Sequence, residues 1–120
     1  MKVVITGAAG GIGSVLSDLL RLNGINLVLI DDLTSGSISN FSLMENRDAL
    51  VKFDLKDEKE TLRLISECTH IIHLAATSSL AECQLNPLTA IQNNVGITSS
   101  IIRCATLLGA KIIFASTGAI

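Results

Sequence analysis

The chain has 120 residues, of which 48% are hydrophobic and 17% are charged. This length suits a single domain, and this balance suits a sheet covered by helices on both faces. A net charge of −2 and an aromatic content of 2% exclude the basic field and the stacking platforms on which nucleic-acid binding depends. The sequence has no apolar run of about 18 residues and opens directly into a strand pattern, so we expect neither a membrane span nor a leader peptide.

Five segments have the apolar character of strands in a parallel sheet. They cover residues 3–6, 26–30, 49–53, 70–74 and 111–115. Helix-like segments separate them, so each connection is a crossover, and such crossovers are right-handed. We therefore predict an α/β fold in one domain over residues 1–120: a Rossmann-type, doubly wound parallel sheet in the order 3-2-1-4-5, truncated after about five strands. The ligand crevice is expected between strands one and four, where the order reverses.

The segments between the strands carry helix signals. In the first of them, five apolar residues recur at helical spacing: Ile12, Val15, Leu16, Leu19 and Leu20. An Asn-Gly pair at 23–24 ends this helix. A short helix is expected at 41–46, and another begins after Asp57. Asn86 and Pro87 supply an N-cap and a first helical residue for a long helix that ends at residue 108.

Three cysteines, Cys68, Cys83 and Cys104, stand far apart, without the close spacing of a zinc site. Their odd number also argues against a disulfide framework. We therefore expect reduced thiols, no bound metal and a cytoplasmic location.

The most informative motif is Thr-Gly-Ala-Ala-Gly-Gly-Ile-Gly at residues 6–13, directly after the first strand. Gly7, Gly10 and Gly13 stand three residues apart in it. One glycine allows the tight turn, one lets a phosphate approach the backbone, and one lets the helix pack closely on the strand. Such a turn presents backbone N–H groups and the positive end of the helix dipole to a diphosphate.

Asp31 follows Gly13 by 18 positions and ends the second strand. In a dinucleotide site such a carboxylate binds the hydroxyl groups of the adenosine ribose, whereas the alternative is a capping or solvated loop aspartate. A 2′-phosphate about 4 Å from this carboxylate would cost on the order of 4 kcal/mol at an effective dielectric constant of about 20. No Lys or Arg lies between Arg21 and Arg47 to offset that repulsion. We therefore predict NAD rather than NADP as the cofactor.

Other strand ends and one helix carry weaker signals, each with a structural alternative. Asp54 ends the third strand and either binds the adenine amino group or only begins a turn. His73 is expected to be a hydrogen-bonded core residue rather than a catalyst. Asn93 and Asn94 lie inside a helix, where Asn is unfavourable, so at least one should contact a neighbouring loop or the cofactor. Thr117 closes the fifth strand, and its hydroxyl is expected to hydrogen-bond either a reacting sugar oxygen or the backbone.

Together these motifs resemble the NAD-dependent epimerase/dehydratase family of the extended short-chain dehydrogenase/reductase superfamily, over nearly the whole chain. The matching pieces are T-G-A-A-G-G-I-G at 6–13, I-D-D-L at 30–33, F-D-L at 53–55, H-L-A-A at 73–76, N-P-L-T-A-I-Q-N-N-V at 86–95 and F-A-S-T-G-A-I from 114. The resemblance implies the NAD-binding portion of a sugar-nucleotide epimerase that acts by transient oxidation at sugar C4. A 4,6-dehydratase or a reductase acting on a nucleotide-sugar is the alternative within the family.

The resemblance also implies roles for individual residues. Backbone groups of Gly11 and Ile12 would contact the pyrophosphate, and Thr117 would be the catalytic hydroxyl that hydrogen-bonds the sugar during hydride transfer. The remaining cofactor contacts would be Asp31, Asp32, Leu33, Ser35 and Gly36 around the adenosine ribose, Asp54 and Leu55 around the adenine, Leu74, Ala75, Ala76 and Thr77 along the pyrophosphate and nicotinamide ribose, and Asn93 from the helix.

One departure from the family bears on activity. The family's general base is a Tyr in a Tyr-x-x-x-Lys motif beyond the position of Thr117, and this chain contains no Tyr. We therefore expect the chain alone to be inactive, either as a truncated enzyme or as a non-catalytic NAD-binding module. Three explanations of the truncation stay open: a fragment, a premature stop, or half of a split protein. The fifth strand is expected to expose an apolar edge and to favour a homo-oligomer or a missing partner.

Overall fold

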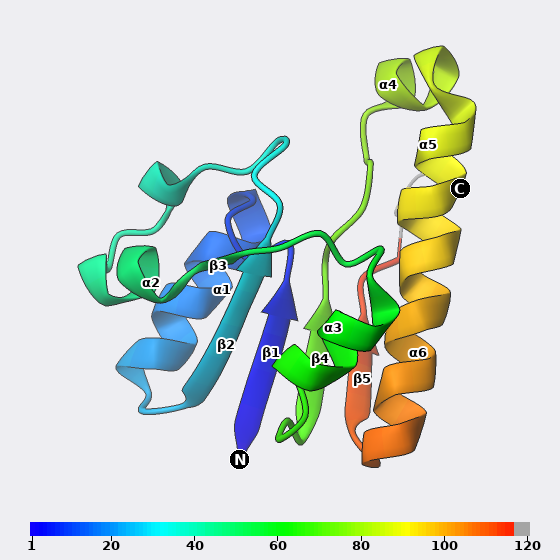
Figure 1. Cartoon of the computed structure of the whole chain (residues 1–120). Coiled ribbons are helices and arrows are strands. Elements are labelled where there is room, and N and C mark those ends of the chain that lie inside the picture. Colours follow the sequence, from blue (N-terminus) through cyan, green and yellow to red (C-terminus); the bar gives the residue numbers. More distant parts are fainter. Residues whose placement is uncertain (117–120) are drawn as a thin grey trace.

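The structure, a computed structural model, describes residues 1–116. Five parallel strands form one sheet in the order β3-β2-β1-β4-β5 (Figure 1), which confirms the predicted fold class and strand order. The strands are β1 (Lys2–Thr6), β2 (Asn26–Asp31), β3 (Val51–Lys52), β4 (His70–His73) and β5 (Lys111–Phe114). Thr6 pairs with Ile30 on one side and with His73 on the other, so the carboxyl ends of the three central strands lie level with one another.

Helices connect the strands and lie on both sides of the sheet (Figure 1). They are α1 (Gly11–Leu22), the short turn η1 (Ile38–Asn40), α2 (Met44–Ala49), α3 (Glu58–Leu64), α4 (Leu80–Leu85), α5 (Pro87–Ile91), the π-helical turn η2 (Gln92–Gly96) and α6 (Ile97–Leu108). Because α2 extends through Ala49, β3 is shorter than the strand predicted at 49–53. Within residues 1–116, no helix combines the length and the apolarity needed to cross a membrane.

Alternate strand residues supply two separate cores, because successive side chains in a strand point to opposite faces of the sheet. One core packs beneath α3 and α6, and its strand members are Val4, Ile30 and Ile71. The other lies on the α1 side, and its members include Val3, Ile5, Leu27, Leu29 and Phe41. Burying each such side chain stabilises the fold by about 1.5–3 kcal/mol, so both faces of the sheet hold their helices.

Helix α1 forms where its apolar spacing predicts, but only part of its apolar stripe packs on the sheet, where Leu16 and Leu20 contact the core on the α1 side. Ile12 and Val15 are 74% and 58% exposed, whereas Gly13 and Ser17 are buried. A Cβ on Gly13 would lie 2.2 Å from the carbonyl oxygen of Gly7, so the start of α1 is pressed against the glycine turn. Only small residues fit in that gap. The period of the apolar residues indicates a helix, but it does not indicate which side of this helix meets the sheet.

The short helix predicted at 41–46 begins three residues later, with α2. Asp18 on α1 accepts hydrogen bonds from the backbone N–H of Ser42 at 2.6 Å and from the side-chain amide of Asn46 at 2.8 Å. Phe41 is fully buried and has an extended backbone just before these contacts. A helix starting at residue 41 would remove that extended conformation, so the predicted start was wrong.

The long helix predicted from 86 to 108 is present but interrupted. Pro87 is its first residue, as predicted, although the side chain of Asn86 makes no capping hydrogen bond. The π-helical turn η2 separates α5 from α6, and the short helix α4, which was not predicted, precedes them. Gly109 ends α6 with a φ of 66°, so the glycine stop is confirmed. A π turn adds a residue to one helical turn and recurs at functional sites.

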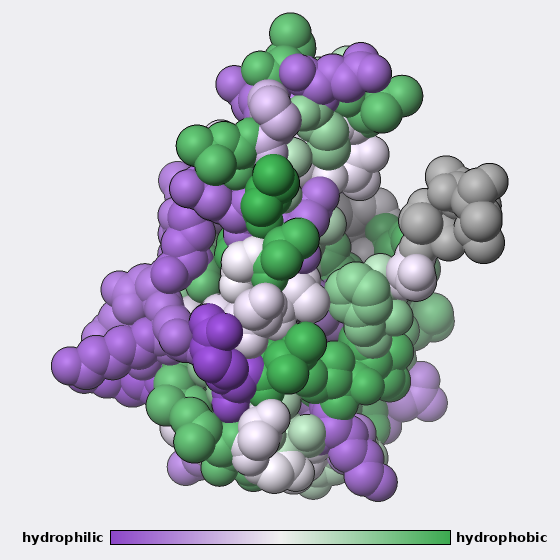
Figure 2. Space-filling model, turned by 90° about the vertical axis from the view of Figure 1, so that its right-hand side faces the viewer, coloured by the Kyte–Doolittle hydropathy of each residue, from purple (hydrophilic) through white to green (hydrophobic). Residues whose placement is uncertain are grey.

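Among the described residues, β5 is the last strand of the sheet on one side. Ile113 and Phe114 of this strand are 59% and 56% exposed, in agreement with the expected apolar edge. Figure 2 views this side of the molecule and shows hydrophobic patches on it. Leu88, Ile91 and Val95 of the long helix are also exposed. Self-association through such a surface stays a prediction.

The close approach of α1 to the glycine turn predicts the effect of one added methyl group. Gly13→Ala would drive a Cβ into backbone, so we expect the free energy of unfolding in urea to fall by about 2 kcal/mol or more. Gly11→Ala is the matched control, because a Cβ there meets nothing within 4 Å and Ala favours a helix over Gly by about 1 kcal/mol. Equal losses in the two variants would contradict this packing.

Candidate functional site

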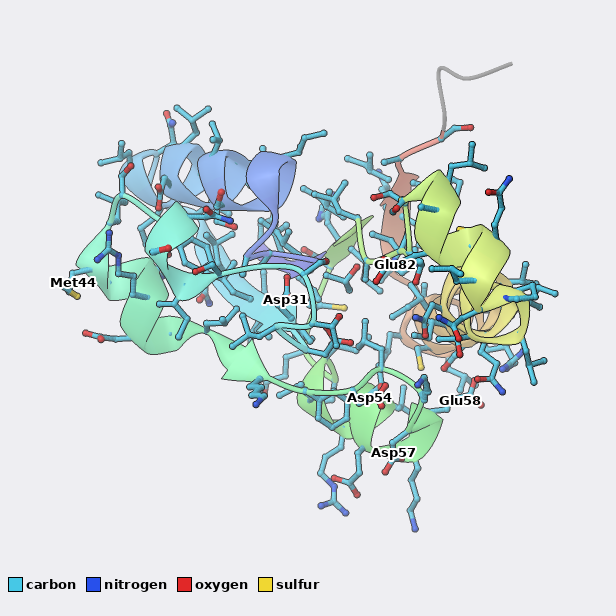
Figure 3. All side chains as sticks on the ribbon, turned by 90° about the horizontal axis from the view of Figure 1, so that it is seen from above. Asp31, Met44, Asp54, Asp57, Glu58 and Glu82 are labelled. Atoms are coloured by element: carbon cyan, nitrogen blue, oxygen red, sulfur yellow. The ribbon has the colours of Figure 1, made fainter. Side chains whose placement is uncertain are left out.

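A cleft of about 450 Å³ opens at the carboxyl ends of the strands, where the strand order reverses. Figure 3 looks down on this end of the molecule and shows Asp31 near its middle, with Asp54 nearer α3. The predicted cofactor residues that line the cleft are Gly7, Gly10, Gly11, Ile12, Gly13, Asp31, Asp32, Ser35, Gly36, Leu55, Leu74, Ala75 and Ala76. Those that do not line it are Leu33, Asp54, Thr77 and Asn93.

The glycine motif forms a tight turn at the floor of the cleft. Gly7 has a φ of +68°, a left-handed conformation that favours glycine, and a Cβ there would lie 2.8 Å from the backbone nitrogen of Ala75. Gly10 takes the N-cap position of α1 without any side-chain cap. The N–H groups of Gly11 and Ile12 therefore have no partner within the helix, and both residues line the cleft. Free N–H groups at a helix start are the groups that bind phosphate.

Asp31 links the glycine turn to the end of β2. Its Oδ2 accepts a hydrogen bond from the backbone N–H of Ala9 at 2.9 Å, and its Oδ1 accepts one from the backbone N–H of Leu33 at 2.8 Å. A carboxylate oxygen has about two acceptor positions, so each oxygen keeps one for another donor. The turn at 7–13 and the Asp31 carboxylate are thus in direct contact.

The segment after β2 folds back over the glycine turn. The backbone N–H of Ser37 and the side-chain amide of Asn40 both donate to the carbonyl oxygen of Ala9, at 3.0 and 2.8 Å. Gly36 passes so close that a Cβ there would lie 2.9 Å from the same oxygen. Leu33, with a φ of 63°, packs against the core on the α1 side rather than lining the cleft. Its side chain therefore supports the loop, and any contact of Leu33 with a cofactor stays a prediction.

At the β3 end, Phe53 and Leu55 give the cleft an apolar wall. Asp54 lies outside this wall and is 59% exposed. Its Oδ1 accepts a hydrogen bond from the backbone N–H of Lys56 at 3.0 Å, and its Oδ2 lies 3.9 Å from Lys56 Nζ. This is the arrangement of a residue that begins a turn, which was the structural alternative for Asp54. Its contact with adenine stays a prediction.

A second hollow of about 340 Å³ continues the cleft past Ala76 and is lined in part by Thr77 and Asn93. Asn94 clasps the backbone of Thr77: its Oδ1 accepts from the N–H at 2.7 Å, and its Nδ2 donates to the carbonyl oxygen at 2.9 Å. Asn93 Nδ2 donates to the hydroxyl of Thr77 at 2.9 Å. Of the two predicted alternatives for this asparagine pair, the contact with a neighbouring loop is therefore present, and the contact of Asn93 with a cofactor stays a prediction.

His73 is buried at the end of β4 and lines neither hollow. Its Nδ1 lies 2.7 Å from the hydroxyl of Thr6, and its Nε2 lies 2.9 Å from the hydroxyl of Thr98. The ring stacks on Phe114, with the centroids 6.1 Å apart. Burial lowers the pKa of His73 below the ordinary value for histidine. These contacts are those of the hydrogen-bonded core histidine that the sequence predicts.

The charged residues that line the cleft are acidic. They are Asp31 and Asp32, and within residues 1–116 no Lys or Arg lines it. Arg47 Nε donates to a backbone carbonyl, and Arg21 Nε donates to a side chain of α2. Lys56 lines the adjoining hollow and not the cleft. A ligand that carried an extra phosphate next to Asp31 would therefore meet repulsion without compensation.

Some residues of the cleft were not singled out from the sequence. Ile30, Ile97 and Ala115 also line it. Ile97 stands four positions after Asn93 on the long helix, so helical spacing from that residue was a signal that could have found it. Thr117, the predicted catalytic hydroxyl, lies outside the described residues.

The cysteines take no part in the cleft. Cys68, Cys83 and Cys104 are free thiols, and burial raises the pKa of both Cys68 and Cys104. In the described part of the chain, 1–116, no three side chains of His, Cys, Asp or Glu come together as a metal site.

Comparison with known proteins gives a consistent result. A family model described as the NAD dependent epimerase/dehydratase family matches residues 3–120. The chain is 37% identical over 122 residues to UDP-glucose 4-epimerase of Mycolicibacterium smegmatis, and this alignment covers 98% of the chain and 39% of that protein. It is 30% identical over 117 residues to UDP-glucuronic acid decarboxylase 4 of Arabidopsis thaliana, and this alignment covers 98% of the chain and 26% of that protein.

The fold has a similarly close match. The crystal structure of Thermus thermophilus UDP-glucose 4-epimerase in complex with NAD superposes with a TM-score of 0.88 at 29% sequence identity, covering 98% of this chain and 38% of that one. The chain therefore spans between 26% and 39% of the length of these three relatives.

The two hydrogen bonds of Asp31 predict a loss of stability in the absence of any ligand. In Asp31→Asn, the amide group would face the N–H of either Ala9 or Leu33, and an unsatisfied donor costs about 1–3 kcal/mol. We expect urea denaturation to show that decrease in the free energy of unfolding. Asp32→Asn is the control, because only Oδ1 of Asp32 accepts bonds, both from Thr34, and Asn retains that oxygen. A loss in the control as large as that in Asp31→Asn would argue against the Asp31 contacts.

The lowered pKa of His73 predicts a loss of stability in mild acid. The unfolded chain binds a proton at His73 more tightly than the folded chain, so stability is unaffected above a pH of about 6.5 and falls as the pH drops below it. Thermal unfolding at about pH 7.5 and about pH 5.5 measures this effect. His73→Gln should weaken the dependence, whereas His70→Gln, on the same strand, should retain it. If the pH dependence of stability were unchanged in His73→Gln, it would have to arise from other titratable groups.

Proposed function

Because the chain belongs to the NAD dependent epimerase/dehydratase family, we propose that the cleft at its strand ends binds NAD. Asp31 holds the adenosine ribose, the N–H groups at the start of α1 hold the diphosphate, and Leu55 packs against the adenine. The observation that carries this proposal is the hydrogen bond from Ala9 to Asp31, because it sets the acidic side chain beside the turn that receives the diphosphate.

The residues present fit this cofactor. Gly7 and Gly36 form a cradle that larger side chains would fill, since a Cβ on Gly36 would lie 3.0 Å from the Asp31 carboxylate. Asp31 keeps one acceptor position on each oxygen, which matches the two vicinal hydroxyl groups of a ribose. The apolar wall at the β3 end suits a flat ring, and the acidic lining disfavours a 2′-phosphate.

The finer activity follows from the relatives. Bound NAD supplies a hydride acceptor for oxidation of a sugar hydroxyl. We propose a nucleotide-sugar as substrate and transient oxidation at sugar C4 as the reaction, as in an epimerase, because UDP-glucose 4-epimerases are similar to this chain both in sequence and in fold. The hydroxyl of Thr117 is proposed to hold the sugar oxygen. A 4,6-dehydratase or reductase is the alternative, and the similarity to a UDP-glucuronic acid decarboxylase adds a third reaction on a UDP-sugar.

A second candidate function is NAD binding without turnover. The observation that favours it is the position of His73, whose two ring nitrogens are both engaged by threonine hydroxyls and which lines neither hollow, so it is not placed there as a general base. Incubating the chain with NAD and UDP-glucose separates the two candidates. Formation of the C4 epimer would refute the non-catalytic reading, whereas NAD binding without conversion of any UDP-sugar would support it.

Isothermal titration calorimetry tests the cofactor. We expect NAD to bind and NADP to bind up to about a thousandfold more weakly, because the 2′-phosphate is repelled by Asp31. Asp31→Asn should weaken NAD binding and narrow the gap between the two cofactors, since it removes the charge. Asp48→Asn, an exposed aspartate on α2 away from the cleft, should retain the wild-type preference. Equal or tighter binding of NADP would refute the preference, and no heat from either dinucleotide would refute the proposed function.

A further inference from the structure

A row of hydrogen bonds joins the ends of β1 and β4, and the bond between Thr6 and His73 is buried. The hydroxyl oxygen of Thr6 lies 3.1 Å from the backbone nitrogen of Leu74, 3.2 Å from that of Ala75 and 2.7 Å from Nδ1 of His73. Nε2 of His73 lies 2.9 Å from the hydroxyl of Thr98 on α6. Thr6 and His73 are 0% and 2% exposed, so bulk water does not compete for the bond between them.

The number of donors and acceptors determines where the protons lie. A threonine hydroxyl has one hydrogen and two acceptor lone pairs. The N–H of Ala75 donates to the hydroxyl of Thr6, and the N–H of Leu74 is shared between that hydroxyl and the carbonyl oxygen of Thr6, at 3.1 Å from each. Of these three neighbours of the hydroxyl, only Nδ1 of His73 can accept its hydrogen. Nδ1 is therefore an acceptor. The neutral ring carries its hydrogen on Nε2 and donates it to the hydroxyl of Thr98.

These bonds hold two walls of the cleft against each other. Leu74 and Ala75 line one side of it, and Gly7 begins the turn on the other. A Cβ on Gly7 would lie 2.8 Å from both the nitrogen of Ala75 and the carbonyl carbon of Leu74, so the two backbones are in contact. The hydroxyl of Thr6, the residue before Gly7, accepts hydrogen bonds from the N–H groups of Leu74 and Ala75.

We propose that neutral His73 is a positioning residue for the dinucleotide: it keeps the Thr6 hydroxyl turned as an acceptor toward Leu74 and Ala75, and so holds the β4 wall of the cleft in place. This role rests on the proposed binding of NAD. His73 lines neither hollow, so it acts through Thr6 and not by contact with the cofactor.

Protonation of His73 would break this arrangement. A hydrogen on Nδ1 would face the hydroxyl of Thr6, whose own hydrogen would then lose its acceptor, so the bonds around this oxygen would have to rearrange. The groups that face the ring are Thr6 from β1, Thr98 from α6 and Phe114 from β5, and none of them is charged. Burial accordingly lowers the pKa of His73 without any opposing charge. NAD binding should therefore weaken in mild acid.

Nitrogen-15 NMR of the labelled wild-type chain tests the proton positions without any ligand. At neutral pH, His73 is expected to carry its hydrogen on Nε2 only, with His70, the other histidine, as an internal reference. The amides of Leu74 and Ala75 should be protected from hydrogen exchange. A hydrogen on Nδ1 at neutral pH would overturn the proposal whether or not NAD binds.

Calorimetric titration with NAD tests the consequence for binding. At neutral pH, His73→Gln and Thr6→Val should each weaken NAD affinity about tenfold to a hundredfold, because each leaves buried hydrogen-bonding groups unpartnered. Thr6→Ser retains the hydroxyl and should keep both the affinity and the amide protection. Thr98→Val, which removes only the partner of Nε2, gives a milder change in the same direction if His73→Gln does not fold.

The pH profile separates positioning from general stability. Wild-type affinity for NAD should fall as the pH drops below the ordinary histidine value of about 6.5, folded His73→Gln should lose this dependence, and His70→Gln should keep it. Wild-type affinity in folded His73→Gln, or a pH dependence that survives in it, would overturn the positioning role. Absence of NAD binding by the wild-type chain would instead overturn the proposed function, and the positioning role with it.

Discussion

The site depends on one close approach: α1 starts so near the end of β1 that only hydrogen fits between Gly13 and the carbonyl oxygen of Gly7. This contact brings the free N–H groups of the first helical turn to the floor of the cleft. It also requires small residues on the inner side of α1, where Ser17 is fully buried. Of the apolar residues of α1 that spacing alone would send inward, Ile12, Val15 and Leu19 are therefore exposed, whereas Leu16 and Leu20 pack against the core.

Three segments at the cleft and its adjoining hollow are each held by a side chain from another element. Asp31 of β2 holds the turn after β1, Thr6 of β1 holds the residues after β4, and Asn94 of the long helix holds Thr77 by both its N–H and its carbonyl oxygen. Loops fixed in this way lose little conformational freedom when a ligand arrives, so more of the interaction energy appears as affinity.

The strand order could be predicted from the sequence, because alternating strands and helices with right-handed crossovers leave few arrangements. The contact of Asp31 with the glycine turn followed from that order, since β1 and β2 end side by side. The predicted start of α2 was wrong, because the actual start is set by Asp18, which lies more than twenty residues earlier in the chain. Local propensity contains no information on such a contact. Asp54 could not be assigned for a similar reason: a strand-end aspartate that begins a turn has the same sequence pattern as one that binds a ring.

The π-helical turn η2 sets the angular phase between two sets of contacts on the long helix. The asparagines within it reach Thr77, while Thr98, just after it, reaches His73 on β4. Successive residues of an α-helix are rotated by about 100°, so removing the additional residue of the π turn would swing one set away from its partner. The number of residues in this helix is therefore fixed. Inserting or deleting one residue near 92–96 would uncouple the loop at 77 from the end of β4.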